Sequence, residues 1–501
     1  MAQAACAPAH RHRPFALRSI VQNDLPSMTH SFILAVAVAA AALPAAALEE
    51  DEVSLLQVAR AQVLEAARTQ LPEAPRPYYW RGKNGDMLRT GASAFAGPFN
   101  LSAGPAWSWQ EEGNGLVRAA PLIDGDRNIY LATIRGNIYK FTRDGQIIWQ
   151  YSSTHSIPDV PALYDGLIYA ATTDGHVIAL DMLTGQLRWR AKAGDSSAGD
   201  TWSMTAGEGT VIAATSADGV MNNRLVALGA KDGSFKWSFE PEVPVYNVLA
   251  AIKDGSVVFS NLFGDPYRLR LADGSVIWHA GPAGGNSSGV SRAFSTGGAV
   301  IGPNGVVYVT SNTDHDAREG HVSAFSFEDG SLLWRRSTGY EANNAAAVGQ
   351  LGPGGRLAVV VGVGANPDMP DQKLQALHQA PTSEKPARVL ALDAESGAEL
   401  WRHELPTWHG WAAGDTIVPH HICLPDSFGN PALAADGTVY VGFESGHLYG
   451  IRDKDGNGRI EGDEVSSFDT GNAFQGSPAI APGLLVATPC NGLYVFRTAQ
   501  A

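Results

Sequence analysis

The sequence predicts an all-β protein, a propeller of eight four-stranded antiparallel blades, and three observations support this fold class. A hairpin motif recurs along the chain and is clearest at residues 179–189, where apolar residues lead to a Thr184-Gly185 turn and a second strand ends in tryptophan. The tryptophans recur at a spacing typical of propeller blades, 40 residues from Trp109 to Trp149 and 40 from Trp149 to Trp189. A further hairpin precedes each of these and supplies the two remaining strands of a blade.

Residues 1–47 are predicted to be a leader and signal peptide. Residues 32–43 are apolar, Pro44 ends this run, and residues 45–47 are alanines that offer a cleavage site. The leader is longer than in usual signal peptides, so Met28 is an alternative start, and an uncleaved signal anchor is the alternative to cleavage. The segment predicts the secretory pathway, with a secreted, cell-surface or lumenal protein and no stable membrane span after cleavage.

Residues 48–79 have helix-forming composition as far as Pro72 and are predicted to be a helical or disordered linker. Residues 80–501 are predicted to be the propeller, whose last unit stops after three strands. We expect the N-terminal strand at residues 107–109 to supply the fourth strand and close the ring, which removes exposed sheet edges. Seven blades is the alternative count, because the repeat at residues 342–401 is degenerate.

The repeat Ala-x-Asp-x-x-Thr/Ser-Gly-x-x-x-Trp, at residues 179–189 and 391–401, resembles the tryptophan-docking motif of pyrroloquinoline-quinone (PQQ) type propellers. This family includes quinoprotein alcohol dehydrogenases and the outer-membrane assembly lipoprotein BamB, and the resemblance covers roughly residues 80–497. Because the fold hosts both enzymes and binding scaffolds, the resemblance implies no single function. It implies that the glycines form turns and that the tryptophans wedge between blades, at Gly185, Gly397, Trp189 and Trp401.

The dehydrogenases that this sequence resembles characteristically carry an adjacent Cys-Cys pair against the cofactor, and some carry a Cys-x-x-Cys-His haem segment. Neither segment occurs here. PQQ is therefore a cofactor that the resemblance suggests and that no specific residue supports, and the catalytic residues stay unassigned. No nucleophile elbow or phosphate-binding loop stands out in the sequence either.

Residues 453–464 match the twelve-position EF-hand calcium loop, the sharpest chemical motif of the chain. Gly458 allows the sharp turn at position 6. The flanking stretches are predicted to be strands and not helices, so we expect a structural Ca²⁺ site that holds a hairpin and not a switch. The alternative is an acidic hairpin tip that only resembles the loop. The predicted ligands at positions 1, 3, 5, 7 and 12 are Asp453, Asp455, Asn457, the carbonyl of Arg459, and Glu464.

The connection at residues 404–426 concentrates histidine, tryptophan and aspartate, and is the best candidate for a ligand-facing loop. The alternative is that Trp408 and Trp411 cap the barrel end while the histidines are solvated or bonded to backbone, since no metal-ligand spacing such as H-x-x-x-H occurs. The candidate ligand-facing residues are His409, Asp415, His420, His421 and Asp426.

Cys423 and Cys490 are the two cysteines that follow the leader, which contains Cys6. In a secreted chain they suggest a disulfide, and two free buried thiols are the alternative. The formal net charge of −14 argues against a nucleic-acid partner, because phosphate binding needs a basic face. The sequence favours a monomeric calcium-binding scaffold that binds protein or glycan through its loops over the alternative, a PQQ-dependent or related oxidoreductase with its site in the central funnel.

Overall fold

The computed structural model describes residues 78–113, 115–198, 202–217, 221–245, 247, 249–281, 296–314, 319–367, 383–415 and 423–498. The predicted leader and residues 48–77 of the predicted linker lie outside these ranges. The described residues belong to one compact unit, Pro77–Ala501. Within them, no helix is long and apolar enough to cross a bilayer, and the helical elements are the short 3₁₀ turns η3 (Leu101–Ala103) and η4 (Gly462–Glu464).

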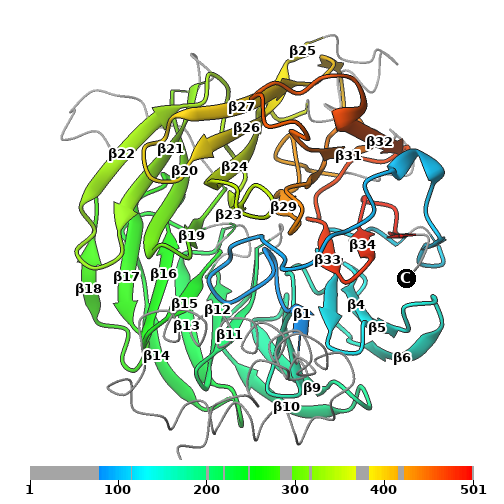
Figure 1. Ribbon diagram of the computed structural model, residues 1–501. Helices are drawn as coiled ribbons and strands as arrows, with labels where there is room; N and C mark the ends of the chain where they lie inside the picture. The colour runs from blue at the N-terminus through cyan, green and yellow to red at the C-terminus, as the bar shows by residue number, and fades with distance from the viewer. Residues whose placement is uncertain are drawn as a thin grey trace, which may run out of the picture. The chain divides into compact units, whose positions relative to one another are not determined.

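Eight antiparallel sheets follow one another around a ring in chain order, which confirms the predicted eight-bladed propeller (Figure 1). Blade 1 contains β3 (Leu122–Asp124), β4 (Ile129–Ala132), β5 (Asn137–Phe141) and β6 (Ile147–Ser152), and blade 2 contains β7 (Ala162–Tyr164), β8 (Leu167–Thr172), β9 (His176–Asp181) and β10 (Leu187–Lys192). Blade 3 contains β11 (Thr205–Gly207), β12 (Thr210–Thr215), β13 (Arg224–Gly229) and β14 (Phe235–Phe239). Blade 4 contains β15 (Ala251–Lys253), β16 (Ser256–Ser260), β17 (Pro266–Arg270) and β18 (Val276–His279).

The other four blades continue the ring. Blade 5 contains β19 (Ala299–Ile301), β20 (Val306–Asp314), β21 (Glu319–Ser326) and β22 (Leu332–Ser337), and blade 6 contains β23 (Ala347–Gln350), β24 (Leu357–Gly364), β26 (Ala387–Asp393) and β27 (Glu399–Glu404). Blade 7 contains β29 (Ala432–Leu433), β30 (Val439–Gly442), β31 (His447–Ile451) and β32 (Val465–Asp469). Blade 8 contains β33 (Ala479–Ala481), β34 (Leu484–Ala487), β35 (Leu493–Arg497) and β2 (Trp107–Trp109). A separate two-stranded sheet pairs β25 (Glu384–Lys385) with β28 (Trp408–His409).

Blade 8 is closed by the N-terminal strand, as the sequence predicted. Strand β2 pairs antiparallel with β35, so that Trp107 lies opposite Val495 and Trp109 opposite Leu493. Pairing the two ends of the chain in one sheet satisfies the backbone groups that an open ring would expose.

The burial of the strands follows their order within a blade. The inner strands are covered on both faces by neighbouring blades, and β12 is buried along its whole length. The outermost strands face solvent on one side, so β10 alternates between exposed and partly buried residues. The sequence follows this order, since the inner strands are rich in Val, Ile and Ala and the outer ones carry charged residues beside tryptophan.

The tryptophans lie between blades, which confirms the structural roles that the resemblance implied. The Trp149 ring packs on the turn of the next blade at Gly185, where φ is +70° and a Cβ would lie 2.7 Å from Cδ2 of that ring. The indole Nε1 of Trp189 donates to the carbonyl of Ala230, 3.1 Å away in the following blade. Gly397 receives the Trp334 ring in the same way.

Residues 78–96 cross the centre of the ring, an arrangement that the sequence analysis did not anticipate (Figure 1). They contact the inner strands of successive blades, first through β1 (Tyr78–Trp80), which pairs with β3. Their further hydrogen bonds, in blade order, join Arg81 O to Leu163 N, Arg81 Nη2 to Ala206 O, Met87 O to Ile252 N, Leu88 O to Ile301 N, Thr90 O to Val348 N, Gly91 O to Leu433 N and Ala96 O to Gly483 N. We call residues 78–96 the central segment.

Arg89 anchors the central segment through hydrogen bonds to carbonyl and hydroxyl oxygens. Its side chain is 2% exposed and donates to the carbonyls of Lys83, Met204 and Ala250 and to the hydroxyl of Thr205. Burial lowers the pKa of the guanidinium to about 9, so the group stays charged at neutral pH. The carbonyl oxygens replace water around this charge, and the central segment is thereby fixed to blades 3 and 4.

Candidate functional site

The predicted calcium loop lies at the rim of blade 7, between β31 and β32. Both flanking elements are strands, as predicted, with the 3₁₀ turn η4 just before β32. The side chain of Ile460 packs against the hydrophobic cluster that contains Trp401, and therefore ties the loop to blade 6. The loop is thus built into a blade hairpin and has no helix pair that could open on ion binding.

The folded loop gathers three of the predicted ligand side chains. One carboxylate oxygen each of Asp453, Asp455 and Glu464 lies within 4.8 Å of the others, a spacing that could hold a metal ion. Asp453 accepts hydrogen bonds from the backbone nitrogens of Asn457 and Gly458, at 3.1 and 3.0 Å. Glu464 is buried and accepts from the backbone nitrogens of Lys454 and Glu461, at 2.6 and 2.9 Å. The backbone thus holds both carboxylates in place.

The other two predicted ligands are exposed. The amide of Asn457 donates to Asp455 at 2.8 Å and accepts from the backbone nitrogen of Arg459 at 2.7 Å. The side chain of Arg459 points to solvent, so only its carbonyl could serve the ion. The ammonium of Lys454 pairs with Asp463, 2.7 Å away, and not with the three clustered carboxylates. Its positive charge is therefore neutralised outside the cluster.

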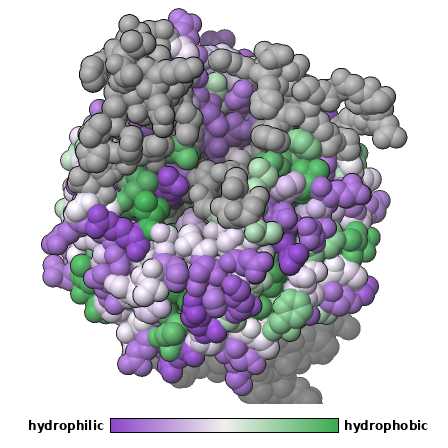
Figure 2. Space-filling model, turned by 180° about the vertical axis from the view of Figure 1, so that it is seen from behind, coloured by the Kyte–Doolittle hydropathy of each residue, from purple (hydrophilic) through white to green (hydrophobic). Residues whose placement is uncertain are grey.

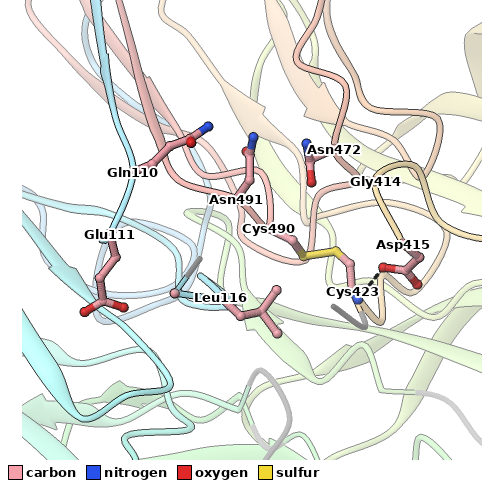
Figure 3. Close-up of a pocket in the computed structure, with 10 residues that line it drawn as sticks. Gln110, Glu111, Leu116, Gly414, Asp415, Cys423, Asn472, Cys490 and Asn491 are labelled. Carbon is pink, nitrogen blue, oxygen red and sulfur yellow. Dashed lines mark hydrogen bonds between the residues drawn. A yellow bond between two sulfur atoms is a disulfide. The ribbon is translucent and has the colours of Figure 1, made fainter. Parts of the chain in front are cut away.

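A second candidate site is a pocket of about 250 Å³ beside Asp415 (Figure 3). Three separate stretches of chain meet there, near residues 110–116, 414–423 and 472–491. The disulfide between Cys423 and Cys490, whose Cα atoms are 5.8 Å apart, forms part of its wall and confirms the predicted bond. The described lining residues are Gln110, Glu111, Gly115, Leu116, Gly414, Asp415, Cys423, Asn472, Cys490 and Asn491.

Asp415 is the titratable group of this pocket near neutral pH. Its carboxylate accepts a hydrogen bond from the backbone nitrogen of Cys423 at 2.8 Å. Burial raises the pKa of Asp415 to about 7, although that bond and the charge of Arg118 act in the opposite direction. A carboxyl that is half protonated at neutral pH can give or take a proton, or bind a cation when ionised.

Glu111 is a lining residue that sequence reasoning missed. It is 6% exposed, and its Oε1 accepts from Thr133, Asn137 and Tyr139, at 3.0, 2.6 and 3.0 Å. Its Oε2 has no hydrogen-bond partner among the residues that the structure describes. No local signal marks this residue, because its partners lie more than 20 residues away along the chain.

The candidate loop residues take different positions. His409 is exposed on β28. The carboxylate of Asp426 accepts from the Thr296 hydroxyl at 2.5 Å, and its backbone carbonyl accepts from the Asn344 side-chain amide at 2.8 Å. Of the candidates in the described ranges, only Asp415 lines the pocket. The indole of Trp408 donates to the carbonyl of Trp411 at 2.8 Å. His420 and His421 lie outside the described residues.

The residues of this pocket do not fit PQQ. That cofactor carries three carboxylate groups, which call for basic partners in a buried site. The described lining residues include two carboxyl groups and no lysine or arginine. The centre of the ring, where a funnel site would lie, is crossed by the central segment.

Comparisons with known proteins point to one family. The sequence profile described as outer membrane protein assembly factor BamB matches residues 103–242 and 251–501. BamB of Bordetella pertussis is 29% identical over 184 residues, 36% of this chain and 45% of that protein. BamB of Xanthomonas campestris is 29% identical over 279 residues, 54% of this chain and 59% of that protein. The chain spans about half the length of these two curated relatives.

Among solved structures, a europium-containing methanol dehydrogenase is similar in fold. It superimposes with a TM-score of 0.60 and 12% identity, and the match covers 83% of this chain and 90% of the dehydrogenase. At this identity the likeness concerns the fold alone, because the same propeller carries unrelated functions.

Proposed function

Because the chain belongs to the family of outer membrane protein assembly factor BamB, we propose that it is an extracytoplasmic scaffold that binds protein partners through its propeller loops. The family match supports the scaffold role, and the disulfide supports the location, because such bonds persist in oxidising compartments. A glycan partner bound through the same loops is the alternative form of this proposal.

The central segment is the observation that carries the scaffold proposal. Its hydrogen bonds to every blade place this chain's own residues where a propeller enzyme would hold a ligand. The surface available to a partner is then formed by the loops and the rim. On the face in Figure 2, hydrophobic residues occur as separate patches among polar ones. This distribution fits a partner held through several polar loops better than one held on a single apolar face.

The scaffold proposal is tested in the source organism by deleting the gene and measuring the amounts of outer-membrane proteins. We expect these amounts to fall, and the native gene to restore them. Native mass spectrometry of the purified protein with added PQQ is the second arm. Unchanged outer-membrane proteins together with a stoichiometric PQQ adduct would overturn the scaffold in favour of an oxidoreductase.

We also propose that the loop at residues 453–464 binds Ca²⁺ as a structural ion. Hard Ca²⁺ favours several oxygen ligands, and the clustered carboxylates of Asp453, Asp455 and Glu464 provide them within one hairpin. An extracytoplasmic location supports this proposal, since extracellular modules function with weak sites. The ion would link the two ends of the loop, and so hold β31 and β32 in register.

The calcium proposal is tested by thermal unfolding in excess Ca²⁺ and in chelator. At a concentration of 100 times Kd, a single site adds about 2.7 kcal/mol to the free energy of unfolding. The variant Asp453→Asn with Glu464→Gln should lose this gain. Asp273→Asn is the matched control, because Asp273 is an acidic residue in the corresponding hairpin turn of blade 4. An equal response to Ca²⁺ in native protein and double variant would refute the site.

A further inference from the structure

We propose that a hollow on the rim between blades 5 and 6 binds a phosphate group. The hollow has a volume of about 350 Å³ and lies between the end of β22 and the strands β26 and β27. Three arginines line it, Arg336 from β22, Arg388 from β26 and Arg402 from β27. Three guanidinium groups from three strands around one hollow are unusual in a chain whose formal net charge is −14.

Each guanidinium group is held by one or two contacts within the protein. Arg336 donates through Nε to the carbonyl of Gly397 at 2.8 Å. Arg388 lies over the Tyr340 ring, 4.2 Å from its centroid, and its Nε is 3.1 Å from a carboxylate oxygen of Glu404. Arg402 donates through Nε and Nη2 to Glu399, both at 2.6 Å. The other N–H groups of these side chains are left for a ligand or water.

The charges around the hollow do not cancel. Glu404 pairs with Arg388 and Glu399 with Arg402, but Arg336 has no carboxylate within ion-pairing distance among the described residues. One positive charge is therefore uncompensated, and the two carboxylates orient their arginines without removing their remaining donors. An anion that enters the hollow would be attracted by Arg336 and would meet donors that are already positioned.

Phosphate fits this donor set better than a carboxylate does. A carboxylate presents two oxygens in one plane and is matched by one guanidinium, as Glu399 and Arg402 show. Phosphate is tetrahedral, and its several oxygens can accept from arginines that approach from different strands. The phosphate could belong to a lipid headgroup or to a free phosphate compound, which share this chemistry.

Isothermal titration of the full chain with inorganic phosphate at low ionic strength tests the proposal. We expect binding that weakens as salt is added, and that falls at least about tenfold in Arg336→Gln with Arg402→Gln, because each charge-assisted contact is worth that factor or more. The matched control is Arg188→Gln with Arg190→Gln. These residues are on the corresponding outer strand of blade 2 and pair with Asp181 and Asp174, so the control removes the same charge elsewhere.

Sedimentation with vesicles of phosphatidylcholine containing phosphatidic acid separates the two sources. Vesicle binding without binding of inorganic phosphate, lost in the Arg336/Arg402 variant, assigns the site to a lipid headgroup. Binding of inorganic phosphate alone assigns it to free phosphate compounds. No binding in either arm, or equal losses in variant and control, would overturn the proposal. If the double variant does not fold, the single exposed substitution Arg336→Gln answers the same question.

Discussion

The junction between blades 6 and 7 differs from the regular junctions of the ring. At regular junctions a buried or partly buried tryptophan packs on a glycine turn and donates to a carbonyl of the next blade, as Trp189 does to Ala230 and Trp237 does to Leu271. At the junction between blades 6 and 7, the predicted calcium loop replaces the glycine turn. Trp401 is 2% exposed there, and its Nε1 has no hydrogen-bond partner among the described residues.

The difference shows that two kinds of turn can join neighbouring blades. The regular turn combines a hydrogen bond with close contact between indole and glycine. Instead, Ile460 of the predicted calcium loop and Val465 of β32 pack against the hydrophobic cluster that contains Trp401, and a Cβ at Gly458 would lie 2.9 Å from the carbonyl oxygen of Leu400. The exceptional junction therefore depends on apolar burial and on the internal order of the loop.

Truncation of Trp401 should have the largest effect. Because the side chain is almost wholly buried, we expect Trp401→Ala to lower the free energy of unfolding by about 3–5 kcal/mol, measured by denaturant unfolding followed by circular dichroism. Trp189→Ala should cost less, since Trp189 is only partly buried. A larger loss of unfolding free energy in Trp189→Ala than in Trp401→Ala would contradict this explanation.

The matched pair of phenylalanine variants sharpens this prediction. Trp189→Phe removes the donor to Ala230, whereas Trp401→Phe removes an indole N–H that has no partner. Only Trp189→Phe should therefore lose free energy of unfolding through a broken hydrogen bond.

A methyl group at a docking turn should have an intermediate effect. Gly185 and Gly166 have similar backbone angles, with φ of +70° and +75°, but a Cβ at Gly185 meets the Trp149 ring while one at Gly166 meets nothing within 4 Å. We expect Gly166→Ala to cost about 1 kcal/mol for the left-handed backbone, and Gly185→Ala about 1–3 kcal/mol more for the clash. Thermal unfolding of both variants measures the difference, and equal losses would show that contact with the indole does not matter.

The smallest effect concerns the carboxylate that shapes a regular turn. Asp181 accepts hydrogen bonds from Leu183, Thr184 and Arg188, and the bonds to Arg188 are the main cause that lowers its pKa to about 2. Because the folded pKa is below the unfolded value of 3.8, its contribution is complete above about pH 4 and is lost as pH falls through about 2. Solvent screening limits it to less than about 1 kcal/mol.

Acid unfolding of Asp181→Asn measures that contribution. The variant should be slightly less stable than the native protein at neutral pH, and the two should converge in acid. A constant difference at every pH would show that the ionised form of Asp181 plays no part in the turn.

Much of the fold was predictable because its signals are contiguous motifs or recur at a regular spacing. The turn at Gly185, the following Trp189 and the closing strand at Trp107 were assigned from spacing and from a last unit that lacked a strand. The predicted calcium loop likewise rests on contiguous residues, and its three carboxylates do lie together. The disulfide was inferred from the count of cysteines and not from any local pattern.

The pocket and the central segment could not be predicted in the same way. Asp415 was one of several candidate residues of its loop, and nothing local separated it from His409 or Asp426. The sequence gives no reason to expect that Arg89 is buried. In the structure it is fully buried and hydrogen-bonded to residues more than 100 positions away.

The sequence by itself determined the repeat, the turns, the tryptophan docking positions and the spacing of the predicted calcium ligands, because each of these is a contiguous motif or one that recurs at a regular spacing. The tertiary structure decided what fills the centre of the ring, which carboxyl faces the pocket beside Cys423, and which arginines share the hollow between blades 5 and 6. These features arise only when ring closure brings distant strands together, since burial and hydrogen bonding are properties of the assembled environment and not of the residue alone.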